Sequence, residues 1–210
     1  MPITVDSPLM GVGGSIAEAR AGLVGLSQVE NDYINEMWRL CEATGLDFRI
    51  MFAQMAHETA GGTSRWWTER HNPAGLGVTG DPAQNEASPY FADGKDAARA
   101  QVAHMLAYVG DGIQTRDGDN GDHLGLSQPI TRYDPRWSAV GDAGFWGSVD
   151  TLGDLGNGKW AVDPDYARLI AATANTIFTQ EEPVSADARP PGTIGCWWPH
   201  DGRAIQEPDR

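Results

Sequence analysis

The sequence predicts a mainly α-helical domain with long loops and at most a small β-hairpin. Three observations favour this class. Apolar residues recur at helical spacing in several segments, polar N-cap residues precede these segments, and glycines follow two of them. The long Gly/Asp-rich stretch 110–160 contains no convincing strand, and we expect only short helices there. With 210 residues, the chain is long enough to bury a sizeable hydrophobic core.

Two helices are predicted in the N-terminal part of the chain. A short helix is expected at 15–23, in a segment rich in glycine and alanine. The second begins after Ser27, because Ser27 and Glu30 form a capping-box pattern in which each side chain binds a backbone N–H near the other residue. Apolar residues then recur every three or four positions until Gly45 ends the helix.

A third helix is predicted to begin after Asp47 and to end before Gly61, with Glu58 near its C-terminal end. Gln54 and Glu58 lie one turn apart along one edge of its apolar face. That face is formed by Phe48, Met51, Phe52 and Met55. A carboxylic acid placed there, facing aromatic residues and a glycine-lined loop, has its pKa raised by the low local dielectric. Glu58 therefore suits a general acid for cleaving sugars.

Residues 62–92 are predicted to be irregular, with at most a short hairpin. Asp93 then caps another helix, whose inward-facing residues are Ala97, Ala98, Val102, Met105, Leu106 and Val109. The last helix is expected to begin at Asp163-Pro164, an N-cap followed by proline in the first turn. Its apolar stripe consists of Tyr166, Leu169, Ile170, Thr173 and Ile177.

The composition changes after Gln180, where acidic residues and prolines follow one another. We therefore predict a domain at 1–180 and a Pro-rich linker or tail at 181–210, which either docks on the domain or leads to a further module. Cys41 stands within a helical pattern and is expected to be buried. Two cysteines do not establish a disulfide between Cys41 and Cys196.

Charge and hydropathy exclude two classes of partner. The formal net charge is −14, and the 15 basic residues do not cluster, so the chain lacks the basic stripe that nucleic acid requires. No apolar stretch approaches the roughly 20 residues needed to cross a bilayer, so we expect no membrane insertion. The N-terminus also lacks the basic region of a secretory signal.

No cofactor or metal is expected. The acidic run 117–123 resembles part of a calcium loop, but Asp122 stands where the loop needs glycine and Gln128 where it needs glutamate. A solvated acidic loop is the better interpretation. The sequence also lacks zinc-ligand spacing and a serine nucleophile elbow.

Four ordered motifs resemble a known family. They are Phe-Ala-Gln-Met-Ala-His-Glu-Thr-Ala-Gly-Gly at 52–62, Asn-Pro-Ala-Gly-Leu-Gly-Val-Thr-Gly at 72–80, Tyr-Phe-Ala-Asp at 90–93, and Lys-Trp-Ala-Val-Asp-Pro-Asp-Tyr-Ala at 159–167. Together they resemble the glucosaminidases of glycoside hydrolase family 73, which are bacterial and phage peptidoglycan hydrolases with a lysozyme-like helical fold. The resemblance covers residues 25–180 approximately.

This resemblance implies hydrolysis of the β-1,4 bond after N-acetylglucosamine in peptidoglycan glycan strands, with Glu58 as the general acid. The family's second carboxylate is not fixed by any motif, and both Asp81 and Glu86 lie in the expected window. We favour Asp81. If neither residue serves, the N-acetyl oxygen of the substrate can attack the anomeric carbon instead.

Several residues are expected to bind the glycan. Tryptophans stack on the apolar faces of sugars, although core packing is expected to take at least one of Trp66 and Trp67. At position 160 the family's tyrosine is replaced by tryptophan. Asn72 suits an acetamido group or an ordinary turn, and Gly75 suits close backbone approach or a positive φ. The complete set is Gln54, Trp66, Trp67, Asn72, Gly75, Trp160 and Tyr166.

Two further function classes remain open at this stage. An N-acetylmuramidase or a lytic transglycosylase uses one acid on the same scaffold and gives different product ends. The replacement at Trp160 and the unassigned second carboxylate also leave room for an inactive cell-wall-binding or virion structural protein. We expect a monomer that acts at the bacterial cell wall, released or carried by a phage, or secreted with its signal removed.

Overall fold

Helices provide nearly all the regular structure of the computed structural model, which describes residues 1–78, 89–110, 124–156 and 158–178. Within these ranges, pairing between extended segments is limited to two isolated bridges, Pro8 with Thr151 and Met10 with Leu46. The predicted mainly α-helical class is therefore confirmed. Asp81, Glu86, the acidic run 117–123 and the tail 181–210 lie outside the described residues.

The second helix begins and ends where its capping residues predict, and the first is shorter at its C-terminal end than the predicted 15–23. Helix α1 (Ile16–Ala21) is capped by the Ser15 side chain. In α2 (Gln28–Thr44) both halves of the capping box form, and the Ser27 N–H donates to Glu30 at 2.8 Å. Gly45 adopts a φ of 83° after α2, a conformation that glycine reaches without the steric cost of a side chain.

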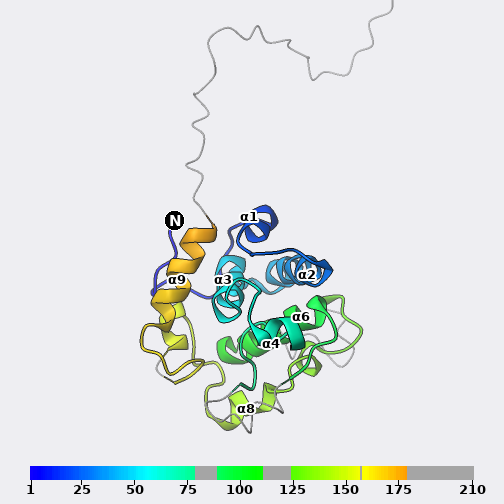
Figure 1. Cartoon of the computed structure of the whole chain (residues 1–210). Coiled ribbons are helices and arrows are strands. Elements are labelled where there is room, and N and C mark those ends of the chain that lie inside the picture. Colours follow the sequence, from blue (N-terminus) through cyan, green and yellow to red (C-terminus); the bar gives the residue numbers. More distant parts are fainter. Residues whose placement is uncertain (79–88, 111–123, 157, 179–210) are drawn as a thin grey trace, which may run out of the picture. The chain divides into compact units, whose positions relative to one another are not determined.

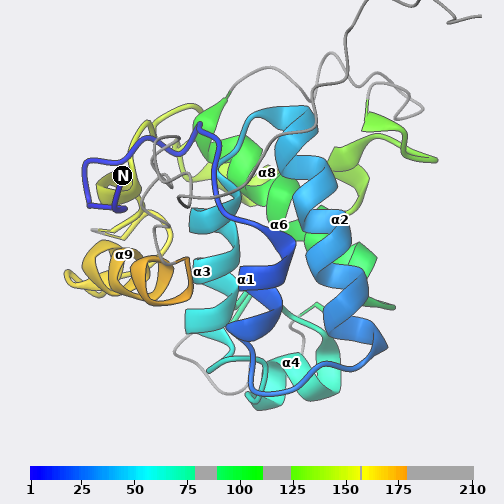
Figure 2. The same cartoon turned by 90° about the horizontal axis from the view of Figure 1, so that it is seen from above.

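Three further long helices build the core with α2. They are α3 (Phe48–Glu58), α6 (Gly94–Val109) and α9 (Tyr166–Ile177). Helix α2 packs against α6, and α3 packs against α9. In both views α3 lies between α9 and α2 (Figure 1, Figure 2). Helices α2 and α6 approach closely at Gly94, where a Cβ atom would lie 2.0 Å from the Val29 carbonyl oxygen.

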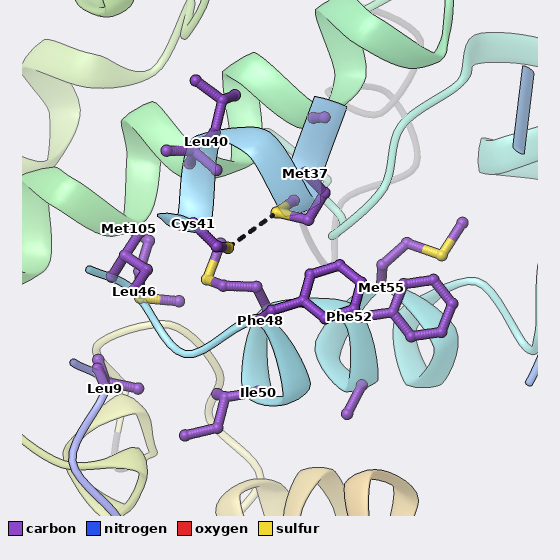
Figure 3. Packing of buried hydrophobic residues seen from close by; sticks show 14 of the residues in the cluster. Leu9, Met37, Leu40, Cys41, Leu46, Phe48, Ile50, Phe52, Met55 and Met105 are labelled. Atoms are coloured by element: carbon purple, nitrogen blue, oxygen red, sulfur yellow. Dashed lines mark hydrogen bonds between the residues drawn. The ribbon is translucent and has the colours of Figure 1, made fainter. Parts of the chain in front are cut away.

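Helix α3 is the central element of the core. Its buried residues point to both sides, toward α2 and toward α9, and only Arg49 of 48–56 is not buried. Phe48 and Phe52 stack with ring centroids 5.9 Å apart, and each also contacts Phe178 edge-on. On the α2 side, the buried Cys41 thiol donates to the Met37 sulfur at 3.7 Å (Figure 3). This burial confirms the prediction for Cys41.

The structure differs from the prediction at two helix starts. Residues 65–70, predicted to be irregular, form α4 (Arg65–Arg70), in which the Ser64 side chain accepts from the Trp67 N–H. A helix of six residues is too short to display a hydrophobic period. Helix α9 begins at Tyr166 with Asp165 as N-cap, whereas we predicted Asp163. Asp163 instead closes a preceding turn, in which its side chain accepts from the Asp165 N–H at 2.8 Å.

The connection between α6 and α9 contains only short helices where it is described. These are η2 (Ile130–Arg132), α8 (Trp137–Asp142) and η3 (Leu152–Leu155). The expectation for 110–160 is thus confirmed in its described part. None of the helices in the four described ranges is long and apolar enough to cross a membrane.

Candidate functional site

Glu58 is the last residue of α3 and is half-buried. Two segments that are distant in sequence lie against its carboxylate. A Cβ atom added to Gly75 would lie 3.5 Å from Glu58 Oε2, and the Tyr166 hydroxyl on α9 donates to Oε1 at 2.9 Å. Glu58 therefore lies between a buried tyrosine and the segment 72–78, which we call the glycine-rich loop.

Burial raises the pKa of Glu58 above its ordinary value. Two weaker effects oppose this shift, namely the hydrogen bond from Tyr166 and the charge of the neighbouring His57. Because desolvation disfavours the carboxylate, the side chain keeps its proton to higher pH than a solvated glutamate. A glutamate with this property can donate a proton to a leaving group.

A continuous set of side-chain hydrogen bonds connects Glu58 to the core, and we call it the buried polar chain. Tyr166 accepts from Gln54 Nε2 at 2.9 Å, and Gln54 Oε1 accepts from Gln101 Nε2 at 2.9 Å. Gln101 Oε1 in turn accepts from the Tyr33 hydroxyl at 2.5 Å. The buried polar chain thus draws on α2, α6, α3 and α9 and satisfies side chains that are shielded from water.

The buried polar chain changes the roles expected for two residues. Gln54 has no exposed surface, and Tyr166 is only 4% exposed. We expected both to contact the glycan, but Gln54 offers no atom to a ligand at this surface and Tyr166 uses its hydroxyl on Glu58. Tyr166 orients the Glu58 carboxyl through its hydrogen bond, and Gln54 in turn holds the Tyr166 hydroxyl.

The two neighbouring tryptophans of α4 lie in different environments. Trp67 is 1% exposed, packs edge-on against Tyr33 at 5.4 Å, and donates from Nε1 to Glu30 at 2.6 Å. Trp67 is therefore a core residue and not a stacking surface, in line with the expectation that core packing takes at least one of the pair. Trp66 is half-buried, and the guanidinium groups of Arg65 and Arg70 lie 5.6 and 5.7 Å from its ring centroid.

Asn72 organises the glycine-rich loop from inside. Its Nδ2 donates to the Leu76 carbonyl at 2.8 Å, and its Oδ1 accepts from the Leu76 N–H at 2.9 Å. Since Asn72 is 1% exposed, its amide serves the loop and not an acetamido group of a ligand, contrary to one of the two expectations for it. Between these residues Gly75 adopts a φ of 62°, a conformation that favours glycine.

A cavity of about 230 Å³ lies beside this loop, and Gly75, whose added Cβ would lie 3.5 Å from Glu58 Oε2, is one of the residues that line it. Glu58 itself is not among the lining residues. They come from the loop, α6, α8 and the segment before α9: Ala74, Gly75, Leu76, Gly77, Val78, His104, Tyr108, Arg136, Ala139, Val140, Ala143, Phe145, Lys159 and Trp160. Trp160 is half-buried, with its ring 4.9 Å from His104 and 5.5 Å from Tyr108. It remains a candidate sugar platform.

Sequence reasoning missed the polar residues of this cavity. His104 Nδ1 lies 2.8 Å from Asp134 Oδ2, and the Asp134 side chain has no exposed surface. Arg136 and Lys159 complete the group. A histidine within the apolar pattern of the α6 segment was the only local signal. In the described residues, no group of three or more His, Cys, Asp or Glu side chains is arranged to hold a metal ion.

Comparison with known protein families gives one match. The family described as Glucosaminidase, mannosyl-glycoprotein endo-beta-N-acetylglucosaminidase, matches residues 34–178. The match covers more than two thirds of the 210-residue chain and includes Glu58, the glycine-rich loop and Trp160. No curated protein and no solved structure matches the chain significantly.

Proposed function

The chain belongs to the glucosaminidase family of glycoside hydrolases, and on this premise we propose that it cleaves peptidoglycan glycan strands at the β-1,4 bond after N-acetylglucosamine. The general acid in this proposal is Glu58. One observation carries the assignment: Glu58 is half-buried with a raised pKa and lies beside the Gly75 backbone, which lines the neighbouring cavity. We propose that the enzyme acts as a monomer at the bacterial cell wall, released by a phage or exported by a bacterium.

In the proposed reaction Glu58 protonates the glycosidic oxygen as the bond to the anomeric carbon breaks. The developing oxocarbenium-like centre then needs a carboxylate, an activated water or the substrate's own acetamido oxygen. Asp81 and Glu86 are the candidates for the second group. Trp160 is proposed to stack on a sugar ring, because its indole lines the cavity. Tyr166 keeps Glu58 in place during proton transfer.

The replacement of the family's tyrosine by Trp160 favours a second set of candidates. Trp160 lacks a phenol, so the cleaved bond or the fate of the intermediate can differ. An N-acetylmuramidase cuts after N-acetylmuramic acid, and a lytic transglycosylase leaves an anhydro end. An inactive cell-wall-binding or virion structural protein retains the cavity and cleaves nothing.

Digestion of purified peptidoglycan tests these alternatives. The wild type, Glu58→Gln and the control Glu42→Gln are compared, because Glu42 is an exposed glutamate at the end of α2. Fragments are reduced with borohydride and identified by mass spectrometry. Reduced N-acetylglucosamine ends from the wild type and Glu42→Gln, lost in Glu58→Gln, are the expected result. Reduced or anhydro muramic ends would show that a different bond is cleaved, the one after N-acetylmuramic acid. The absence of fragments from several wall types would refute hydrolysis.

The second catalytic group is tested in the same assay with Asp81→Asn and Glu86→Gln. Loss of a general base or nucleophile typically lowers the rate by about 100-fold or more. We expect this loss in Asp81→Asn and near-normal activity in Glu86→Gln. The reverse pattern would assign the role to Glu86, and activity in both variants would favour participation of the substrate acetamido group.

A further inference from the structure

The cavity beside Gly75 has a charge opposite to that of the chain. The whole protein carries 29 acidic and 15 basic residues. Among the described residues, those that line the cavity nevertheless include Arg136, Lys159 and His104 and no aspartate or glutamate. Asp134 is not among these lining residues, and its buried carboxylate lies 2.8 Å from His104 Nδ1. Within the described lining, Arg136 and Lys159 are therefore the residues that carry a full positive charge.

Arg136 is held in place by its backbone, while its charge stays available. Its N–H donates to Asp134 Oδ1 at 2.7 Å, and its Cδ lies 3.6 Å from the position that a Cβ on Gly77 would take. Its guanidinium forms no hydrogen bond or ion pair with another described side chain. Other arginines of the described chain do pair with carboxylates, namely Arg39, Arg49, Arg99 and Arg168.

Lys159 contributes a second positive charge on another segment. Its Nζ donates to the Ser148 carbonyl at 2.5 Å, and its own carbonyl accepts from the Tyr108 hydroxyl at 2.9 Å. No carboxylate within the described ranges forms an ion pair with Lys159. The ammonium is thus hydrogen-bonded to a neutral partner, and its charge also helps to lower the pKa of the Asp154 carboxyl.

From this arrangement we propose that the cavity is a subsite for a carboxylate of the glycan strand, bound by Arg136 with Lys159 as an auxiliary charge. A guanidinium binds a carboxylate through two parallel hydrogen bonds, and this geometry makes arginine selective for such groups. The inference rests on the proposed function for its substrate, since peptidoglycan carries carboxylates on the lactyl group of muramic acid and on its peptide stems. Local cations are needed because the net charge of −14 repels an anionic strand.

Binding to the Glu58→Gln protein tests the subsite without cleavage. Calorimetry compares three glycans of equal length: peptidoglycan strands with intact stems, strands stripped of stems so that lactyl carboxylates are free, and neutral chitooligosaccharides. Arg136→Gln is introduced into the same background. The matched control is Arg132→Gln, because Arg132 is another exposed arginine, on η2, that does not line this cavity.

We expect Arg136→Gln to weaken binding of a carboxylate-bearing strand by about 10-fold, the effect of one charge-assisted hydrogen bond, and to leave chitooligosaccharide binding unchanged. Lys159→Gln should weaken binding of the carboxylate-bearing strand by a smaller factor, and Arg132→Gln should leave this binding unchanged. Preference for stripped strands would identify the lactyl carboxylate, and preference for intact strands would identify the stem. Added salt should reduce the difference between charged and neutral glycans.

The proposed subsite would be refuted if Arg136→Gln weakened binding of charged and neutral glycans equally, or if it did not weaken binding at all. So would failure of the protein to bind any of the three glycans. These results are independent of hydrolysis, because a chain that cleaves nothing can still show Arg136-dependent binding. Conversely, cleavage with unaltered charge preference in Arg136→Gln refutes the subsite and leaves the proposed function standing.

Discussion

The Tyr166 hydroxyl donates a 2.9 Å hydrogen bond to Glu58 Oε1 and so opposes the effect of burial on the acid. Replacing Tyr166 by phenylalanine removes a donor to the charged form, so the pKa of Glu58 should rise further. The alkaline limb of the kcat/KM profile should therefore move to higher pH. The control is Tyr90→Phe, since Tyr90 is exposed. An unmoved limb in Tyr166→Phe would argue against Glu58 as the titrating acid.

The raised pKa of Glu58 also makes stability depend on pH. Because the folded state binds this proton more tightly than the unfolded state, the protonated glutamate is favourable at low pH. That contribution is lost as the pH rises from the unfolded pKa through the folded pKa. Glu58→Gln, which is never charged, should thus raise the melting temperature at neutral pH and lose this advantage in acid. A constant difference between the two proteins across this pH range would contradict the assignment.

Gln101 is the most connected member of the buried polar chain. It accepts from Tyr33 and donates to Gln54 and to the Met51 carbonyl at 3.0 Å. Gln101→Leu leaves several buried groups without partners, at about 1–3 kcal/mol for each group. We expect a decrease of at least about 2 kcal/mol in the free energy of unfolding, measured with urea. Gln128→Leu makes the same change at an exposed site and should be nearly neutral.

The two tryptophans of α4 provide a matched pair. Trp67→Ala removes a buried ring and the donor to Glu30, and should lower the free energy of unfolding by about 3–5 kcal/mol. Trp66→Ala removes a half-buried ring near two guanidinium groups, and should cost about 1 kcal/mol. Thermal melts of both variants measure the difference. Similar losses would mean that Trp66 is also part of the core.

Gly75→Ala tests whether the loop must approach the acid. The new methyl group would lie 3.5 Å from Glu58 Oε2, and the φ of 62° adds a strain of about 1–2 kcal/mol. Gly125→Ala meets the same kind of strain, at a φ of 65°, with no atom within 4 Å of its Cβ. Both variants should lose similar stability, because 3.5 Å is an ordinary contact distance, but only Gly75→Ala places a methyl group beside Glu58 and should lower activity. Equal activities would show that the methyl group does not disturb the site.

Local signals were sufficient for much of the fold. Three helices begin directly after the N-cap residue that the sequence predicts, because a cap acts within a few residues. These N-caps are Ser27, which forms a capping box with Glu30, Asp47 and Asp93. The first turn of α9 was placed two residues early, since Asp163 and Asp165 are both acceptable caps by sequence. Helix α4 was missed because six residues contain too little periodicity.

The candidate site was predictable only where a motif marks it. Glu58 and the glycine-rich loop stand in such motifs, and the structure brings them together. The partners of Gln54 and Tyr166 could not be derived, because their contacts join positions separated by 47 and 108 residues. Arg136 is in an irregular segment without periodicity, so its place in the cavity depends on the tertiary fold alone.

The buried polar chain also limits which partly folded forms of this protein can be active. Its members come from four helices, and each helix supplies a donor or acceptor that another helix needs. If any one of these helices shifts along its axis or detaches, polar groups are left unpaired in the interior and Glu58 loses its orientation. If Glu58 is the proposed acid, inactivation and loss of tertiary structure should therefore occur in the same cooperative transition, and a loosened intermediate should not retain the geometry around Glu58.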